Sequence, residues 1–177
     1  RISKDFKTKH MLLSLHCWII HKRLINNAIS TDPAYSRQLQ EQFFDVLWSD
    51  AGARIRAVGI RELMFNKYLK DVQNYTFESL AQFDEAYAKP SRTERHEELA
   101  SALWRVIWNS SDAVSDDHCR RLARYVERES EKVSLLDETA FLDGRVEWGR
   151  APRWDLKVDG AGGKGKGKEK GKGKKRR

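Results

Sequence analysis

Apolar residues recur every three or four positions over most of the chain, which is the spacing of an α-helix. The clearest stretch runs from Phe43 to Tyr75, where two helical segments follow each other across Gly59. The first segment predicts an inward face made of Phe43, Val46, Leu47, Ala51, Ile55 and Val58. The second predicts an inward face made of Leu63, Met64, Tyr68, Leu69 and Val72. We expect two packed helices, with Gly59 ending the first in a left-handed cap.

Start and stop signals divide the rest of the N-terminal half. Residues 1–29 predict a long helix that is apolar nearly all round in its middle, as expected of the buried central helix of a bundle. Asp32 suits the N-cap of the next helix and Pro33 its first position, where the missing N–H is not needed. Residues 61–88 have a helical pattern, but poor helix formers cluster at 74–76, so we expect a break there.

The C-terminal half contains similar start signals. Ser91 and Glu94 form a capping box, in which each side chain satisfies the backbone N–H of the other, and a helix should follow. Ser115, followed by two aspartates, marks another helix start. Residues 120–132 of that helix are dense in alternating charges, which most simply indicates a solvated face.

Residues 141–158 are not periodic, and they predict an extended strap held on the bundle by Trp148 and Trp154. The whole pattern predicts an all-α fold, a single helical bundle of about five to six helices with this strap and a disordered basic tail. The boundaries that we assign are residues 1–149 for the helical domain, 150–159 for the extended strap and 160–177 for a Lys/Gly-rich flexible tail.

Composition agrees with one domain. The chain has 177 residues, of which 40% are hydrophobic, enough for a single core without disulfides. Two cysteines form no disulfide framework, so a reducing compartment is the default. No run of about 18 apolar residues occurs, and no transmembrane segment is predicted. Because the sequence begins at Arg1 instead of Met, targeting cannot be inferred from it.

The positive charge of the chain is concentrated in residues 160–177. They contain nine basic residues and one acid, a balance of +8 (9 − 1) that equals the net charge of the whole chain (34 − 26), so residues 1–159 are neutral. The domain therefore lacks the overall positive field of a dedicated nucleic-acid-binding fold. The basic residues of this polyanion-binding tail are Lys164, Lys166, Lys168, Lys170, Lys172, Lys174, Lys175, Arg176 and Arg177. A polyanion is the predicted target, either an RNA phosphate backbone such as that of ribosomal RNA or anionic lipid, and a purely solubilising tail is the alternative.

Candidate chemistry is sparse. Cys17 and His21 share a helical face and could bind a metal if further ligands were supplied, but packed core residues are the commoner explanation. Trp104 and Trp108 widen an apolar face, for which core packing is preferred over a docking surface. The chain contains no Gly-rich phosphate loop, no HExxH and no Ser/His/Asp set that can be placed. We therefore predict a protein that is not an enzyme and has no catalytic residues, metal site or cofactor.

Four motifs, in the same order, resemble the ubiquinol:cytochrome c chaperone family, the assembly factors of respiratory complex III. They are LHCWIIHKRL at 15–24, FFDVLWSDAGARIRAVGI at 43–60, NKYLKDVQNYTFESLAQFDEA at 66–86 and ELASALWRVIW at 98–108. The resemblance covers about residues 11–149, including the closing GRVEWG. The chain departs from the family pattern after Arg105, where members commonly have a small polar pair, and in its Lys/Gly tail.

The resemblance implies an all-α, non-enzymatic chaperone of mitochondria, on the matrix side or at the inner-membrane periphery. Such a chaperone binds newly made cytochrome b and promotes its assembly into complex III, near the mitochondrial ribosome and with a small partner assembly factor. A competing hypothesis is a ribosome-associated RNA-binding or ribosome-assembly module that uses the basic tail. A contiguous basic face of Arg54, Arg56, Lys67 and Lys70, without acidic neighbours, would favour that hypothesis.

Polar residues on the outward sides of the central helices are the predicted client or partner surface. These residues are Asp50, Arg54, Lys67, Lys70, Gln73 and Tyr75. The alternative is an internal network of ion pairs at i,i+4 spacing, joining Asp50 to Arg54 and Lys67 to Asp71. Both interpretations remain open at the level of the sequence.

Overall fold

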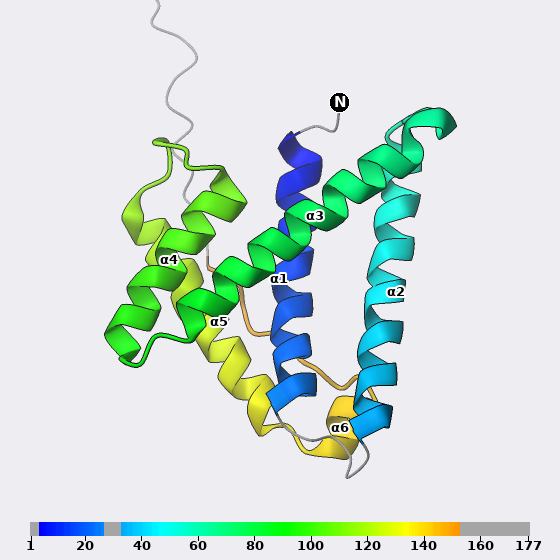
Figure 1. Ribbon diagram of the computed structural model, residues 1–177. Coiled ribbons are helices and arrows are strands. Elements are labelled where there is room, and N and C mark those ends of the chain that lie inside the picture. The colour runs from blue at the N-terminus through cyan, green and yellow to red at the C-terminus, as the bar shows by residue number, and fades with distance from the viewer. Residues whose placement is uncertain (1–3, 27–32, 153–177) are drawn as a thin grey trace, which may run out of the picture.

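The computed structural model describes residues 4–26 and 33–152, and all regular structure in these ranges is helical. The helices are α1 (Lys4–Asn26), α2 (Pro33–Ala57), α3 (Glu62–Tyr87), α4 (Arg92–Trp108), α5 (Asp116–Leu135) and α6 (Glu138–Leu142). The prediction of an all-α bundle is confirmed for the described part of the chain. Figure 1 shows the six helices and the chain order.

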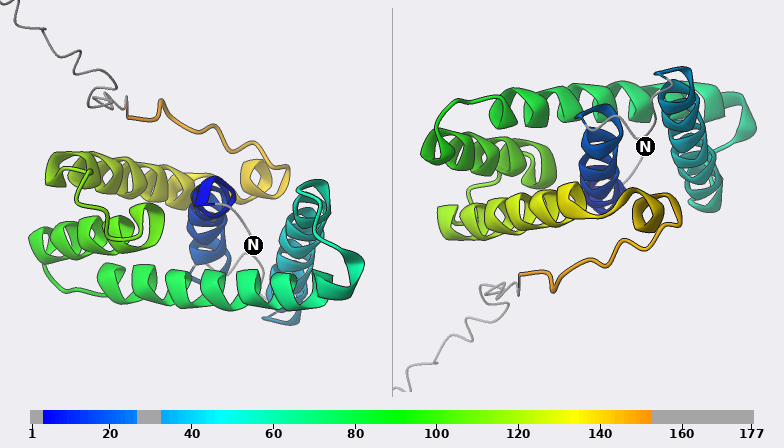
Figure 2. Two further views of the ribbon diagram at one scale, coloured as in Figure 1. Left: turned by 90° about the horizontal axis from the view of Figure 1, so that it is seen from above. Right: turned by 90° about the horizontal axis from the view of Figure 1, so that it is seen from below.

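The helices form three layers around α1. Seen from above and below, α3 lies on one side, α5 and α6 lie on the other, and α4, α1 and α2 stand between them (Figure 2). α1 packs against each of α2, α3, α4 and α5. The predicted central helix is therefore confirmed over Lys4–Asn26.

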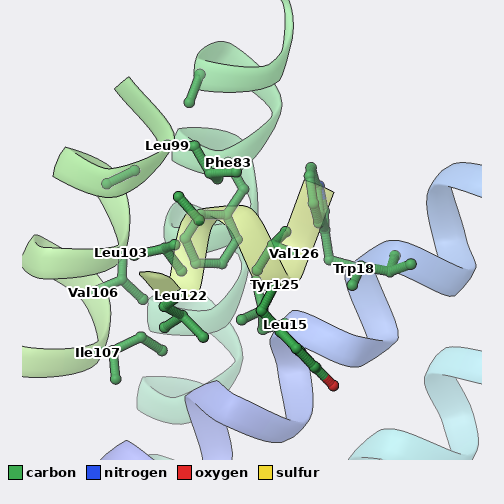
Figure 3. Close-up of a cluster of buried hydrophobic side chains, with 14 of the residues drawn as sticks. Leu15, Trp18, Phe83, Leu99, Leu103, Val106, Ile107, Leu122, Tyr125 and Val126 are labelled. Carbon is green, nitrogen blue, oxygen red and sulfur yellow. The ribbon is translucent and has the colours of Figure 1, made fainter. Parts of the chain in front are cut away.

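The main core joins α1, α3, α4 and α5 (Figure 3). Trp18 of α1 and Phe83 of α3 are fully buried, with ring centroids 5.7 Å apart. Leu103 of α4 and Val126 of α5 are also fully buried. The Trp18 indole N–H donates to Asp84 at 2.9 Å, so the polar group of this large side chain is satisfied at the edge of the core.

A second, smaller core attaches α2 to the bundle. It consists of Phe6 of α1, Ile55 of α2, and Phe65 and Val72 of α3. A Cβ added to Gly52 would lie 3.2 Å from the Phe65 ring, so glycine permits this close approach of α2 and α3. The fully buried residues among the described side chains of α2 all lie in its C-terminal half, which makes α2 the least embedded of the five long helices.

The start and stop signals within the described residues lie where predicted, whereas Asp32, the predicted N-cap of α2, lies outside them. α2 begins at Pro33, and Gly59 follows its end with φ +79°. The Ser91 hydroxyl accepts from the Glu94 N–H at 3.0 Å at the start of α4, which is one of the two hydrogen bonds of the predicted capping box, and α5 begins directly after Ser115. These features depend on neighbours in the sequence, which explains why the pattern alone identified them.

The break expected at residues 74–76 is wrong, because α3 is continuous from Glu62 to Tyr87. Thr76 and Ser79 donate their hydroxyl hydrogens to carbonyls one turn back, of Val72 and Tyr75, each at 2.7 Å. The Tyr75 hydroxyl donates to the Val106 carbonyl of α4 at 2.9 Å. Tertiary contacts thus override weak helix propensity in this segment.

Three residues predicted to face inward are exposed instead. Val46 is 69%, Val58 53% and Leu63 97% exposed. The reason is that α2 packs along a narrow face, while its connection to α3 extends away from α4 and α5 (Figure 1). Among the described helices, none lies at that tip to cover apolar side chains.

The C-terminal strap begins between its two expected starts, after residue 141 and before residue 150. Residues 138–142 form α6, which places Phe141 in the main core; a turn follows at 143–144, and the segment without regular structure begins at Arg145. Trp148 packs edge-on against His16 of α1, with centroids 4.6 Å apart. Trp154 lies outside the described residues, as does the rest of the strap after residue 152.

The interpretation of residues 120–132 as a solvated face is wrong at Glu129, which is 1% exposed. Glu129 accepts from the Gly149 N–H at 2.8 Å and from the Arg128 Nε at 2.7 Å. Burial on its own raises the pKa of Glu129, but these two donors outweigh it and hold the pKa below the ordinary value. Glu129 therefore fixes the strap to α5 as a buried carboxylate.

Candidate functional site

A polar junction joins α1, α2 and α3 between the two cores. His10 of α1 is 1% exposed, and its Nε2 lies 2.9 Å from the Thr76 hydroxyl of α3. Arg54 of α2 donates to the His10 Nδ1 at 3.1 Å and pairs with Asp50 at 2.6 Å. Because Nδ1 accepts, Nε2 is the protonated nitrogen and donates to Thr76.

The electrostatics of the junction keep His10 neutral. Burial, followed by the positive charge of Arg54, lowers the pKa of His10 from 6.5 to about 4. The Arg54 guanidinium also lies over the Phe6 ring, 5.6 Å from its centroid. Arg54, predicted as a surface residue, therefore connects α2 to α1, and the ion pair predicted between Asp50 and Arg54 is present.

The other predicted surface residues lie on different sides of α3. Lys67 and Lys70 are exposed, and Gln73 is half-buried. Tyr75 faces α4 through its hydrogen bond to Val106, and burial raises its pKa. Within the described ranges no ion pair joins Lys67 to Asp71. The structure thus pairs Asp50 with Arg54, and helix spacing places Lys70 and Gln73 on one face of α3, but the six residues are not gathered on one surface.

The four cations named for the RNA-binding hypothesis do not form a basic face without acidic neighbours. Arg54 pairs with Asp50 at 2.6 Å, and Arg56 pairs with Glu62 at 3.2 Å. Half of the set is therefore neutralised locally. This arrangement does not favour the RNA-binding alternative for the helical domain.

An exposed group of aromatic side chains joins α2 to α3. We call Phe43, Phe44, Trp48 and Phe77 the aromatic patch. Ring centroids are 6.1 Å apart for Phe44 and Trp48, 5.9 Å for Phe44 and Phe77, and 5.3 Å for Trp48 and Phe77. Phe77 remains 51% exposed, and the α2 rings are half-buried. The group is therefore packed within itself and open to solvent.

The aromatic patch lies where α2 and α3 diverge. These helices meet at their connecting tip and separate from it, with α1 beside both (Figure 1). His21 of α1 packs on Phe44 with centroids 5.1 Å apart, so α1 borders the patch. Phe77 follows Gln73 by four residues and Lys70 by seven, which places the three on one face of α3. Sequence analysis missed Phe77, although its signal was an aromatic residue on an otherwise polar helix face.

The remaining sequence candidates have packing roles. Burial, followed by the charge of Asp50, raises the pKa of Cys17 to about 11, and burial lowers the pKa of His21. Trp104 and Trp108 pack against the main core, which agrees with the preference for core packing over a docking surface. Within residues 4–26 and 33–152, no group of three or more His, Cys, Asp or Glu side chains is placed to bind a metal.

Two further expectations concern the tail and the membrane. The basic residues from Lys164 to Arg177 lie outside the described residues. Of the helices that the structure describes, none is sufficiently long and apolar to cross a membrane.

The fold and its surface define a helical protein with an exposed aromatic group, a feature by which proteins bind apolar segments of other proteins. A family model described as Ubiquinol-cytochrome C chaperone matches residues 1–148, and the chain belongs to this family. Membership implies a chaperone role in complex III assembly and a mitochondrial location. Comparisons with curated proteins and with solved structures find no match.

Proposed function

We propose that this protein binds newly made cytochrome b through the aromatic patch and promotes its assembly into ubiquinol:cytochrome c reductase without catalysing a reaction. A small partner assembly factor acts with it, on the matrix side or at the inner-membrane periphery. The observation that supports the client site best is Phe77, which is 51% exposed although two aromatic residues of α2, Phe44 and Trp48, lie beside it.

The chemistry of the patch suits a hydrophobic client. A newly made membrane subunit exposes apolar helix surface to water before assembly, and covering that surface is favourable by about 25 cal/mol per Å². Aromatic side chains provide large, rigid contact areas and are enriched among the residues that dominate binding energy. A client helix lying in the angle between α2 and α3 would contact Trp48 of α2 and Phe77 of α3 at the same time, because the two rings are adjacent.

Polar residues of α3 extend this surface. Lys70 and Gln73 share the helix face of Phe77, so these two of the predicted client residues are retained in the proposal. Lys67, one turn before Lys70, borders the same surface. Arg54 and Tyr75 are assigned to the contacts between helices described above instead, and the exposed Asp50 to its ion pair with Arg54.

Site-specific photo-crosslinking tests the client site. A photo-reactive amino acid replaces Phe77 in one variant and Leu135 of α5, which is 78% exposed and remote in sequence, in the matched control. After synthesis of mitochondrial proteins, we expect a cytochrome b adduct from position 77 and much less from position 135. Equal adducts from both positions, or none from position 77, would contradict the proposed surface.

Removal of the ring gives a second measurement. Phe77→Ala should weaken capture of cytochrome b by about tenfold, the effect of losing an interface side chain worth about 1.4 kcal/mol. The same change should lower the unfolding midpoint only slightly, because half of the side chain is already exposed. Leu135→Ala is the control. Undiminished capture by Phe77→Ala would count against the patch.

We further propose that the basic tail places the chaperone near the mitochondrial ribosome. Nine cations against one acid suit a phosphate backbone, and neutralising six phosphates would give a slope of log affinity on log salt of about −4 to −5. Truncation after Asp159 should abolish salt-sensitive binding to ribosomes and leave the stability of the bundle nearly unchanged. Binding to anionic vesicles, measured in parallel, distinguishes RNA from lipid. Unchanged ribosome binding by the truncated chain would refute the role of the tail.

A further inference from the structure

A cleft of about 470 Å³ lies between α1, the end of α3, the start of α4 and α5, and shares no residue with the aromatic patch. This volume is in the range of small-molecule sites, which is about 300–1,000 Å³. Lys22 and Arg23 of α1 and Arg92 and Arg95 of α4 line the cleft. Helices that are distant in the sequence thus bring four cationic side chains to one place.

The cleft retains an excess of positive charge. Four cations face two carboxylates of α5, Glu127 and Glu131, and Lys22 also pairs with Asp84 at 3.4 Å, which leaves a balance of +1 (4 − 3). Glu127 also accepts from His96 at 3.0 Å, and its negative charge is partly engaged there. Arg92 is exposed and forms no ion pair with any residue in the described ranges. An anion entering the cleft would therefore meet a favourable field.

The Tyr87 ring organises two of these cations. The Lys22 Nζ lies 4.9 Å and the Arg95 guanidinium carbon 5.2 Å from its centroid. These cation–π contacts hold the two side chains at the cleft. The contact of Arg95 does not neutralise its charge, whereas Lys22 also pairs with Asp84 of α3 at 3.4 Å. The ring itself supplies an apolar wall, together with Ile19.

Three polar atoms in the lining are buried and have no hydrogen-bond partner among the described residues: Arg95 Nε, Glu127 Oε1 and Ser130 Oγ. Buried polar atoms are normally hydrogen-bonded, and an atom left without a partner destabilises the fold. Arg95 Nε requires a hydrogen-bond acceptor, and Glu127 Oε1 requires a donor. The Ser130 hydroxyl can either donate or accept a hydrogen bond. Their common location at one cleft indicates a ligand with both kinds of group.

We propose that this cleft binds a phosphate ester that also carries a hydroxyl or ammonium donor. The phosphate oxygens accept from Arg95 and Ser130 and are attracted by Lys22 and Arg92, and the donor group of the ligand satisfies Glu127. Sulfate has the charge but no donor at neutral pH, so it should bind more weakly. The ligand chemistry has two sources, a free phosphate ester and a phospholipid headgroup.

Titration of the full chain with glycerol 3-phosphate, followed by NMR and calorimetry, tests the site. We expect saturable binding with shifts of the Tyr87 and Ser130 signals, and weaker binding of sulfate. Arg95→Gln should weaken the affinity by about tenfold, as expected for a hydrogen bond to a charged group. Arg92→Gln, whose exposed side chain is not needed for folding, should also weaken it. Arg124→Gln, an equal loss of charge at an exposed position of α5 outside the cleft, is the matched control.

Binding to vesicles with and without phosphatidylglycerol distinguishes a phospholipid headgroup from a free phosphate ester as the ligand. A loss of vesicle binding in Arg92→Gln and Arg95→Gln beyond that in Arg124→Gln assigns the site to a lipid headgroup, because the tail is common to all variants. If the two cleft variants lose affinity for glycerol 3-phosphate but bind vesicles as well as Arg124→Gln does, the site is assigned to a free phosphate ester. If neither ligand distinguishes the cleft variants from Arg124→Gln, or if sulfate binds as well as glycerol 3-phosphate, the assigned ligand class is wrong.

Discussion

Acidification should uncouple α2 from the bundle through His10. The neutral ring accepts from Arg54 and donates to Thr76, so it holds three helices together only in that protonation state. Protonation places a hydrogen on Nδ1, where it faces the Arg54 guanidinium. The junction then loses a hydrogen bond and gains a repulsion between two like charges.

The sign and size follow from the two pKa values of His10. The folded-state value, about 4, lies below the ordinary value of 6.5, so between these values the unfolded chain binds the proton and the folded chain does not. The stability that the neutral ring contributes is present at pH 7 and is lost as the pH falls through this window. From pH 7 to pH 4.5 the loss is about 2 kcal/mol, and the full effect is about 3 kcal/mol.

Urea unfolding at pH 7 and pH 4.5, followed by far-UV circular dichroism, measures this loss in the natural chain and in His10→Gln. The variant removes the titrating group, so its decrease in the free energy of unfolding should be smaller by about 2 kcal/mol. Comparing the decrease within each protein cancels any baseline effect of the substitution. NMR titration of the His10 imidazole provides an independent check. Equal decreases in both proteins, or an imidazole that titrates near 6.5, would refute the argument.

Two local predictions concern the strap and a helix end. Glu129→Ala should lower the free energy of unfolding by about 1–3 kcal/mol and speed tryptic cleavage at Arg145 and Arg150, because the Gly149 N–H loses its buried acceptor; unchanged cleavage would show that Glu129 does not fix the strap. Gly59→Ala should cost about 1 kcal/mol, since φ is +79° there, and Gly59→Asn should cost less. Equal midpoints of thermal unfolding for Gly59→Ala and the natural chain would contradict the prediction for Gly59.

Several features of the fold were predictable because they depend on nearby residues. The helix start at Pro33, the stop at Gly59 and the cap at Ser91 involve side chains and backbone groups within one turn. The apolar middle of α1 likewise identified the central helix, since a helix without a polar face must be surrounded. Family motifs in the right order indicated the chaperone family, which the match over residues 1–148 confirms.

The tertiary structure decided which of these faces are covered. Periodicity shows that Val46 and Phe77 lie on helices, but exposure depends on whether another helix packs there, and α2 diverges from its neighbours. Arg54 is charged and on the sequence alone is expected at the surface, yet its hydrogen bond to His10, 44 positions earlier, makes it part of the junction. Likewise, the cleft collects cations from α1 and α4, which only the packing of the bundle brings together. Contacts between residues distant in the sequence are set by helix crossing geometry, which local hydrophobic patterns do not specify.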